Sequence, residues 1–258
     1  MSVMIEPGFV GNKYPLTHGR ICGQSVLPSG TVVASSAKTG FDGTNAADPR
    51  EHNFWRPGSA NATLTVTLPE VRKLSYIALA AHNLGSLGVT VRIEVSDGLG
   101  GFDNASGHLA PSDDNPFIYL FKEIETDLFR LRFKQDFATI GVFDAGEAIE
   151  VPVRAYTSIG TPANMARQTE FDVNRTASGA FVGRSVRRDR NVAPYPIEHV
   201  SEYWVQNTLD PFIEDSILNP YFLAENPHQY PEATQYKWAE KDIMPKRMGL
   251  KNLMSVTL

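Results

Sequence analysis

The side chains that could carry hydrolytic chemistry are few in this sequence. Such chemistry needs a nucleophile, a base and an orienting group, and the chain holds one cysteine, Cys22, and six scattered histidines. It contains no GxSxG elbow, HExxH pair, P-loop or GxGxxG fingerprint. We interpret Cys22 as a buried or incidental thiol, and the glycine-rich stretch at 98–102 as a plain hairpin loop. We therefore predict that the protein is not an enzyme.

Oxygen donors gather in one loop, where Asp42, Asn45 and Asp48 follow each other at intervals of three residues. Carboxylate and amide oxygens bind calcium when backbone carbonyls complete the shell. The same residue types commonly do no more than shape a turn. Both interpretations stay open, and calcium is the one cofactor that the sequence suggests.

The densest charge lies in the segment RSVRRDRN, which contains Arg184, Arg187, Arg188 and Arg190. These side chains could pair with phosphates or with an acidic subunit surface. No aromatic residues are interleaved with them, and a formal net charge of -5 makes the whole molecule repel nucleic acid. We therefore favour a solvated edge or a subunit contact and do not expect a nucleic-acid partner.

Alternating apolar and polar residues dominate the chain from Ala60 to about Val153. This period of two places alternate side chains on opposite faces of a half-buried strand. The clearest runs are 64–68, 89–95 and 129–133. Two further runs, 73–81 and 117–121, are continuously apolar, as expected of strands that are covered on both faces. Without amphipathic helices between them, these strands predict an antiparallel sandwich.

The composition changes near residues 154–170, which we interpret as an extended connector of small and polar residues. It divides the chain into a β-sandwich domain at 1–155 and an α+β domain at 156–258. Two strand-like runs joined by the turn at 177–179 predict a hairpin at the start of the second domain.

Helix signals appear only in the C-terminal part of the chain. Ser201 can cap a helix that begins at Glu202, and Asp210-Pro211 predicts a second helix start. The segment from Tyr221 to Pro245 then predicts a strand, a proline-rich loop and a strand, and LMSVTL predicts a final strand. The predicted fold is therefore mainly β, with short helices in the C-terminal part.

The composition is that of a globular protein, with 258 residues of which 42% are hydrophobic and 21% are charged. A single cysteine excludes an intramolecular disulfide. The first residues lack a basic segment followed by an apolar one, and no window approaches the roughly 20 apolar residues that span a bilayer. We expect synthesis in a cytoplasm, with neither secretion nor a membrane partner.

The range 33–146 resembles the galactose-binding-like sandwich, also known as the discoidin or coagulation-factor C-type fold. The resemblance is one of layout: the small-residue opening VVASSAKTGFDGTNAADP, then Trp55, then the apolar strands that begin with ATLTVTLPEV. The later segments LFRLRF and IGVFDAGEAIEVP also fit. The resemblance implies a jelly-roll fold whose loops at one end can bind sugars.

Trp55, His82 and Asn83 could converge at such an end, beside the loop that holds Asp42 and Asn45. An aromatic face with nearby amides and carboxylates suits a sugar, so these three residues form a candidate site for a host-surface glycan. The alternative, which we favour, is that Trp55 fills the core of the sandwich.

Roughly the last 90 residues resemble proteins encoded in the structural modules of tailed bacteriophages. The segments that carry the resemblance are GAFVGRSVRR, the Trp204 helix followed by Asp210-Pro211-Phe212, NPYFLAENPHQYPE, YKWAEKDIMP and GLKNLMSVTL. The chain departs from this pattern at Glu225, where related chains often carry a tryptophan. The resemblance implies a place in a virion tail or its tip or baseplate.

Trp204, Phe212 and Tyr221 supply aromatic anchors typical of permanent interfaces, although some of them must also be core. With Arg184, Arg187 and Arg188 they form the candidate subunit interface. We predict a non-enzymatic structural subunit of a virion, forming a homo-oligomeric ring with copies of itself or contacts with other virion proteins. The alternative is a carbohydrate-binding module.

Overall fold

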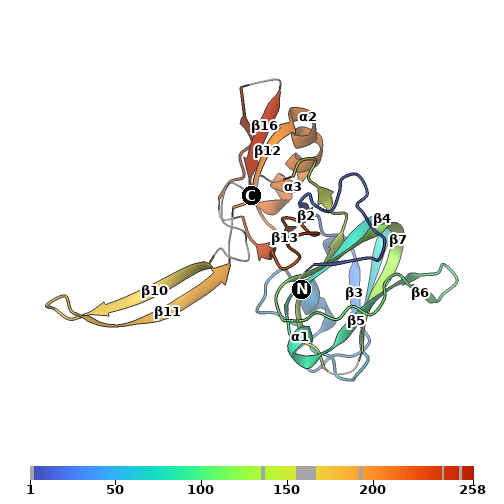
Figure 1. Cartoon of the computed structure of the whole chain (residues 1–258). Coiled ribbons are helices and arrows are strands. Elements are labelled where there is room, and N and C mark those ends of the chain that lie inside the picture. Colours follow the sequence, from blue (N-terminus) through green and yellow to red (C-terminus); the bar gives the residue numbers. More distant parts are fainter. Residues whose placement is uncertain (1–2, 135–136, 155–166, 192–193, 240, 250–251) are drawn as a thin grey trace.

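The computed structural model describes residues 3–134, 137–154, 167–191, 194–239, 241–249 and 252–258. Figure 1 shows a sandwich, a smaller C-terminal body packed against it, and a long hairpin that projects away from both. The predicted fold class, mainly β with an N-terminal antiparallel sandwich and short C-terminal helices, is confirmed. No helix in the described part of the chain is both long and apolar enough to cross a bilayer.

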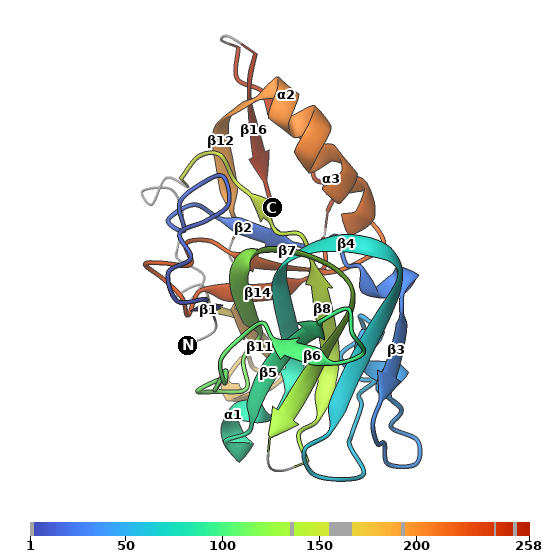
Figure 2. The ribbon, with the colours of Figure 1, turned by 90° about the vertical axis from the view of Figure 1, so that its right-hand side faces the viewer.

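The sandwich is organised by two long antiparallel strands, β4 (Thr63–His82) and β7 (Phe117–Lys134). Register shifts near residues 67–76 mark the place where the pair bends from one layer into the other, a curvature that Figure 2 shows. The other sandwich strands are β1 (Val3–Ile5), β3 (Thr31–Ala34), β5 (Thr90–Ser96), β6 (Phe102–Asn104) and β8 (Ile140–Gly146). Short helical segments are η1 (Leu27–Ser29), η2 (Gly43–Ala47) and α1 (Leu84–Leu87).

Each layer is built from one half of both long strands. In the first layer, the N-terminal half of β4 and the C-terminal half of β7 are flanked by β3 and β5, with β6 outside β5. In the second layer, the other two halves are flanked by β8 and by β1, which pairs with β7 in parallel. The main core lies between the layers and includes Trp55, Leu64, Ile93, Phe129 and Phe143.

A four-stranded sheet covers the outer face of the second layer. It consists of β14 (Thr234–Lys237), β13 (Tyr221–Ala224), β2 (Arg20–Cys22) and β9 (Ile149–Glu150). Tyr76, Ile118 and Val142 of the second layer pack against Phe222 and Ala224 of this sheet in a separate core cluster. Residues 74–80 of the run at 73–81 and all of 117–121 are therefore covered on both faces, which confirms the prediction from their continuous apolar runs.

This covering sheet combines strands from both ends of the chain, because β2 pairs with β13 as well as with β9. A buried ion pair stabilises the junction: Arg20 lies 3.4 Å from Glu150, with 1% and 6% of their side chains exposed. The Glu150 carboxylate accepts hydrogen bonds from the backbone N–H groups of residues 12–14, and Arg20 donates to four backbone carbonyls. The predicted domain boundary at 155 thus separates two parts that share one sheet.

The C-terminal body adds a continuous helix and a small sheet. The helix comprises α2 (Glu202–Trp204), a wide π turn η3 (Val205–Leu209) and α3 (Asp210–Ser216). The Ser201 side chain accepts from the Trp204 N–H, so the predicted cap is present. The α-helical segment α3 does begin at the predicted Asp210, but no side chain caps it there, because the π turn leads into it without a break. The small sheet has the order β12 (Pro196–Ser201), β16 (Leu253–Thr257), β15 (Lys246–Arg247).

The predicted hairpin is present as β10 (Arg167–Arg175) and β11 (Phe181–Asn191). The strands at 221–224, 234–237 and 253–257 also confirm the predicted C-terminal strands. Residues 155–166 of the predicted connector lie outside the described residues, and 167–170 belong to β10 instead.

Replacing Glu150 tests how strongly the buried ion pair stabilises the fold. We expect Glu150→Gln to lower the free energy of unfolding by about 3–5 kcal/mol, because Arg20 would keep a buried charge without its counter-ion. The measurement is urea unfolding followed by fluorescence. Glu70→Gln is the control, since that side chain is 63% exposed and its ion pair with Arg72 lies on the surface. Equal losses in both variants would contradict the prediction.

Candidate functional site

The three residues predicted to bind a glycan do lie at one end of the sandwich. Trp55 and Ile140 exchange two backbone hydrogen bonds, at 2.9 and 3.1 Å. On the neighbouring strand β4, His82 is the cross-strand partner of Ile140 in the antiparallel pair of β4 and β8. The Asn83 side-chain oxygen accepts from the Thr139 N–H at 2.6 Å. Thr139 and Ile140 therefore bring the three residues to neighbouring positions.

Burial removes most of this group from contact with a ligand. Trp55 is fully buried, donates from its ring nitrogen to the Ser36 carbonyl at 3.0 Å, and packs on Phe133. His82 is also buried, and burial lowers the pKa of its ring. Trp55 thus fills the core, as the alternative interpretation proposed, and Asn83 is half-buried.

Other aromatic and cationic side chains lie at the same end, some of them exposed and the others half-buried. Phe41 and Phe54 stack with ring centroids 5.0 Å apart, and the Arg56 guanidinium lies over both rings. Phe137 is 43% exposed, with the Lys38 ammonium 5.4 Å from its ring centroid. Sequence reasoning missed this group, which we call the aromatic loop cluster. The available signal was the presence of aromatic and basic residues on either side of Trp55.

The predicted calcium ligands are already engaged with protein groups or lie at the surface. Asp48 accepts hydrogen bonds from Arg50 and Asn53, and the Arg50 side chain holds the pKa of this carboxyl well below its usual range. The Asn45 amide donates to the Phe54 carbonyl, and Asp42 is exposed before η2. Among the described residues, no group of three or more His, Cys, Asp or Glu side chains is suited to a metal. Calcium binding here stays a prediction.

The predicted interface aromatics occupy the interior of the C-terminal body. Trp204, Phe212 and Tyr221 are at most 9% exposed and belong to one core cluster. Phe212 and Tyr221 pack edge to face, with ring centroids 5.0 Å apart. These three residues therefore stabilise the fold and are not accessible to a partner. The helix spacing indicated an apolar face but not that the body's own strands would cover it.

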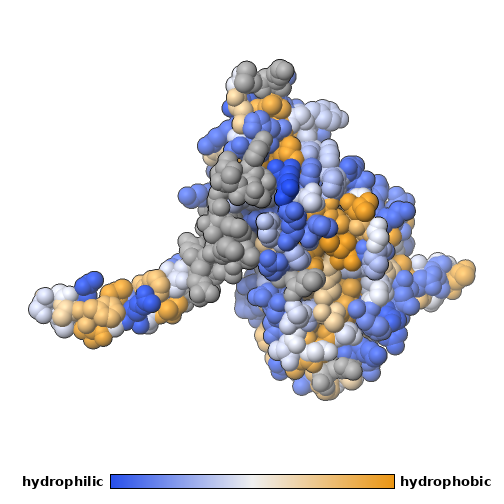
Figure 3. Space-filling view, in the orientation of Figure 1, coloured by the Kyte–Doolittle hydropathy of each residue, from blue (hydrophilic) through white to orange (hydrophobic). Residues whose placement is uncertain are grey.

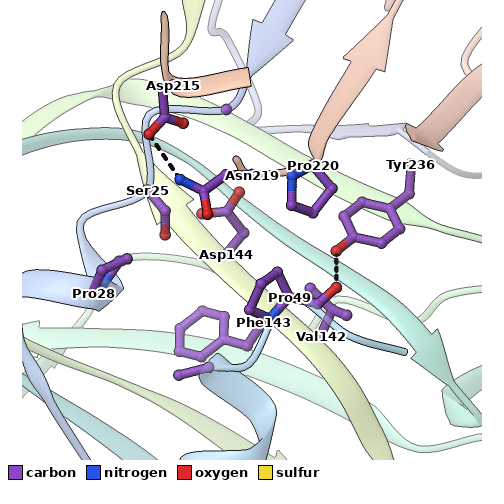
Figure 4. Close-up of a pocket in the computed structure, with 12 residues that line it drawn as sticks. Ser25, Pro28, Pro49, Val142, Phe143, Asp144, Asp215, Asn219, Pro220 and Tyr236 are labelled. Atoms are coloured by element: carbon purple, nitrogen blue, oxygen red, sulfur yellow. Dashed lines mark hydrogen bonds between the residues drawn. The ribbon is translucent and has the colours of Figure 1, made fainter. Parts of the chain in front are cut away.

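Two carboxylates line a small cavity between the sandwich and the C-terminal body. The cavity has a volume of about 60 Å³, and Asp144 of β8 and Asp215 of α3 contribute to its wall together with Ser25 and Asn219. Figure 4 shows these four side chains grouped around one polar space. Asn219 donates to Asp215 at 2.9 Å. The volume suits a few water molecules rather than a drug-sized ligand of roughly 300 Å³ or more.

The environment of Asp144 favours its protonated form. The pKa of this carboxyl is raised to about 7, mainly by burial and also by the negative charge of Asp215, while the nearby hydroxyl groups of Ser25 and Tyr76 act in the opposite direction. Asp144 lies beneath the covering sheet, where the sandwich meets the C-terminal body. With a pKa of about 7, its carboxyl changes from the neutral to the charged form near neutral pH.

The β10–β11 hairpin has one apolar and one polar face. Cross-strand pairing places Phe171 opposite Val186 and Val173 opposite Arg184, and Val182 lies next to them on β11 as the unpaired residue of a β-bulge. Four of these residues are exposed apolar side chains, from 44% for Phe171 to 65% for Val182. Figure 3 shows apolar surface along this projecting arm. We call these five residues the apolar face of the hairpin.

Of the predicted interface arginines, one can be placed on this face. The Arg184 guanidinium lies over the Phe171 ring, 4.5 Å from its centroid. The side chains of Arg187 and Arg188 lie outside the described residues. The structure thus brings Arg184 together with exposed apolar groups, whereas the predicted aromatic anchors belong to a separate core.

No protein-family model and no curated protein matches the chain. Solved structures resemble about half of it. The Clostridium perfringens module CpGH89CBM32-5, in complex with GalNAc-β-1,3-galactose, is 12% identical, with a TM-score of 0.43 over 48% of this chain and 100% of that chain. A family 32 carbohydrate-binding module from C. perfringens NanJ, in complex with galactose, is 19% identical, with a TM-score of 0.40 over 49% and 98%. A pectin-binding module is 18% identical, with a TM-score of 0.42 over 51% and 97%.

The buried carboxyl predicts a pH-dependent stability difference for Asp144→Asn. The folded-state pKa of about 7 lies above the usual 3.8, so wild-type stability falls as pH rises from about 4 to about 7. Asparagine cannot ionise. We therefore expect similar melting temperatures at pH 4 and a higher one for the variant at pH 8, measured by calorimetry. The exposed Asp103→Asn is the control, and a pH-independent difference for Asp144→Asn would contradict the assignment.

Proposed function

We propose that the protein is a non-enzymatic structural subunit that assembles with other protein chains through its β10–β11 hairpin. The observation that carries this proposal is the apolar face of the hairpin, which is exposed along a two-stranded arm. Among the described strands, β10 and β11 pair only with each other. A two-stranded hairpin alone in water is marginally stable, so a partner surface would both shield and stabilise it.

Energetics support an assembly role for this arm. Burying one large apolar side chain contributes about 1.5–3 kcal/mol, and the apolar face offers Phe171, Val173, Val182 and Val186. Exposed apolar side chains gathered on one face mark interaction surfaces rather than ordinary scattered surface residues. The flanking arginine adds a charged group that can select a complementary partner.

The setting that we propose for this assembly is a tailed-bacteriophage virion, in the tail or its tip or baseplate. The resemblance of roughly the last 90 residues to phage structural proteins supports this setting. In that case the hairpin would contact copies of this chain or neighbouring virion proteins, and the protein would reside in the particle.

Quantitative peptide mass spectrometry of density-purified particles tests this function. We expect the chain at a small, fixed copy number relative to the major capsid protein. A variant in which residues 168–190 are replaced by a short Gly-Ser linker should fold but fail to enter particles, because the contact surface is gone. A variant with Leu99→Ser, on a different exposed loop, is the control. Absence of the wild-type chain from particles would overturn the proposal.

A second candidate function, glycan binding, is favoured by the aromatic loop cluster. Aromatic rings that are exposed or half-buried, beside Lys38 and Arg56, offer stacking faces and hydrogen-bond donors at one end of the sandwich. These are the features by which a concave or loop-lined surface could recognise a sugar ring.

Titration of the full chain against a host-polysaccharide array tests the glycan candidate. If the cluster binds sugar, Phe137→Ala should weaken binding at least about tenfold, which corresponds to roughly 1.4 kcal/mol, because it removes an exposed ring. Leu99→Ala should leave binding unchanged. No binding of the wild-type protein at millimolar sugar would exclude this function.

A further inference from the structure

We infer that the apolar face of the hairpin docks on the outer face of the helix Glu202–Ser216 of a second copy of this chain. This inference rests on the proposed assembly role of the hairpin and names its partner. It follows from the charge on the arm, the composition of the helix and the positions of the two on the molecule.

The hairpin is a basic arm on an acidic molecule. The range 167–191 contains six arginines, no lysine and three acidic residues. Taking these from the totals of 24 basic and 29 acidic residues leaves 18 basic and 26 acidic residues elsewhere. The arm therefore has a formal charge of +3, and the remaining chain has -8. Such a distribution attracts the arm of one copy to the acidic surface of another.

The helix combines negative charge with exposed apolar side chains. From Glu202 to Leu218 the chain contains four acidic residues and no lysine or arginine. Asp210 and Glu214 are exposed and lie one turn apart on the same face. At the end of this helix Ile217 is 71% and Leu218 is 76% exposed, whereas Phe212 faces the core.

The two surfaces match in chemistry. Each carries exposed aliphatic side chains next to charges of opposite sign: Arg184 on the hairpin, and Asp210 and Glu214 on the helix. Burying the aliphatic groups together while the charges pair at the rim would give the arrangement found in stable protein interfaces, an apolar centre with a polar edge.

The positions of the two surfaces exclude their meeting within one copy. Figure 1 shows the hairpin projecting away from the body, and the helix lies across the body from it. Figure 2, seen from the right-hand side of Figure 1, shows α2 and α3 facing the viewer. A contact between two different surfaces of identical chains repeats in one direction, and it forms a ring where the rotation closes.

A charge exchange between the two surfaces tests the inference in solution. By sedimentation velocity of the full chain at low salt, we expect wild-type protein to self-associate, and Arg184→Glu or Glu214→Arg to weaken association at least about tenfold. Each variant alone places like charges across the contact. An equimolar mixture of the two should associate again, because both alternating contacts then pair opposite charges.

Rescue by mixing separates a direct contact from a general loss of stability. Arg72→Glu, a charge reversal on the exposed edge of the sandwich, is the matched control and should associate like the wild type. A wild-type chain that stays monomeric up to about 100 µM would overturn the inference. Self-association that neither Arg184→Glu nor Glu214→Arg weakens would overturn it as well. A monomer whose hairpin is still required for incorporation into particles would leave the proposed function standing and assign the arm to a different virion protein.

Discussion

The buried pair of Arg20 and Glu150 is the constraint on which the arrangement of the molecule depends. Both groups are taken out of water, so the structure must supply their hydrogen bonds. Glu150 receives three backbone N–H donors from residues 12–14, and Arg20 satisfies carbonyls of the same loop. This network orders the N-terminal loop and places β2 between β9 and β13. The covering sheet exists because β2 is held at that position.

The covering sheet in turn sets the chemistry of the joint below it. Once the outer face of the second layer is covered, Ala78 and Ile118 are buried on that side, and so is Asp144 of β8. A carboxyl in this position loses the stabilisation that water gives to its charge, and Asp215 adds a second negative group from α3. The raised pKa of Asp144 is therefore a consequence of how the two parts are joined.

Local pattern was sufficient to predict much of the fold and little of the site. Alternation identified the strands at 64–68, 89–95 and 129–133, and continuous apolar runs identified the covered strands, because both signals depend only on which faces are buried. The strands β2 and β9 are too short for a pattern, and the charges that hold them are about 130 positions apart. Likewise, helix spacing marked Phe212 as apolar but could not tell core from interface, since that depends on which elements cover it.

In the hairpin, the sequence pattern predicts burial of the apolar side chains, but the structure of the chain leaves them exposed. Apolar residues alternate with polar ones in β10 and in part of β11, as they do in the sandwich strands, where the facing layer buries the apolar side chains. In the hairpin the pattern is present and the facing layer is not, so Phe171 and Val186 remain exposed. A pattern of half-buried strands in a segment that the protein leaves uncovered is most simply completed by another chain. The +3 charge of the arm, against -8 for the rest of the chain, favours a second copy as that chain.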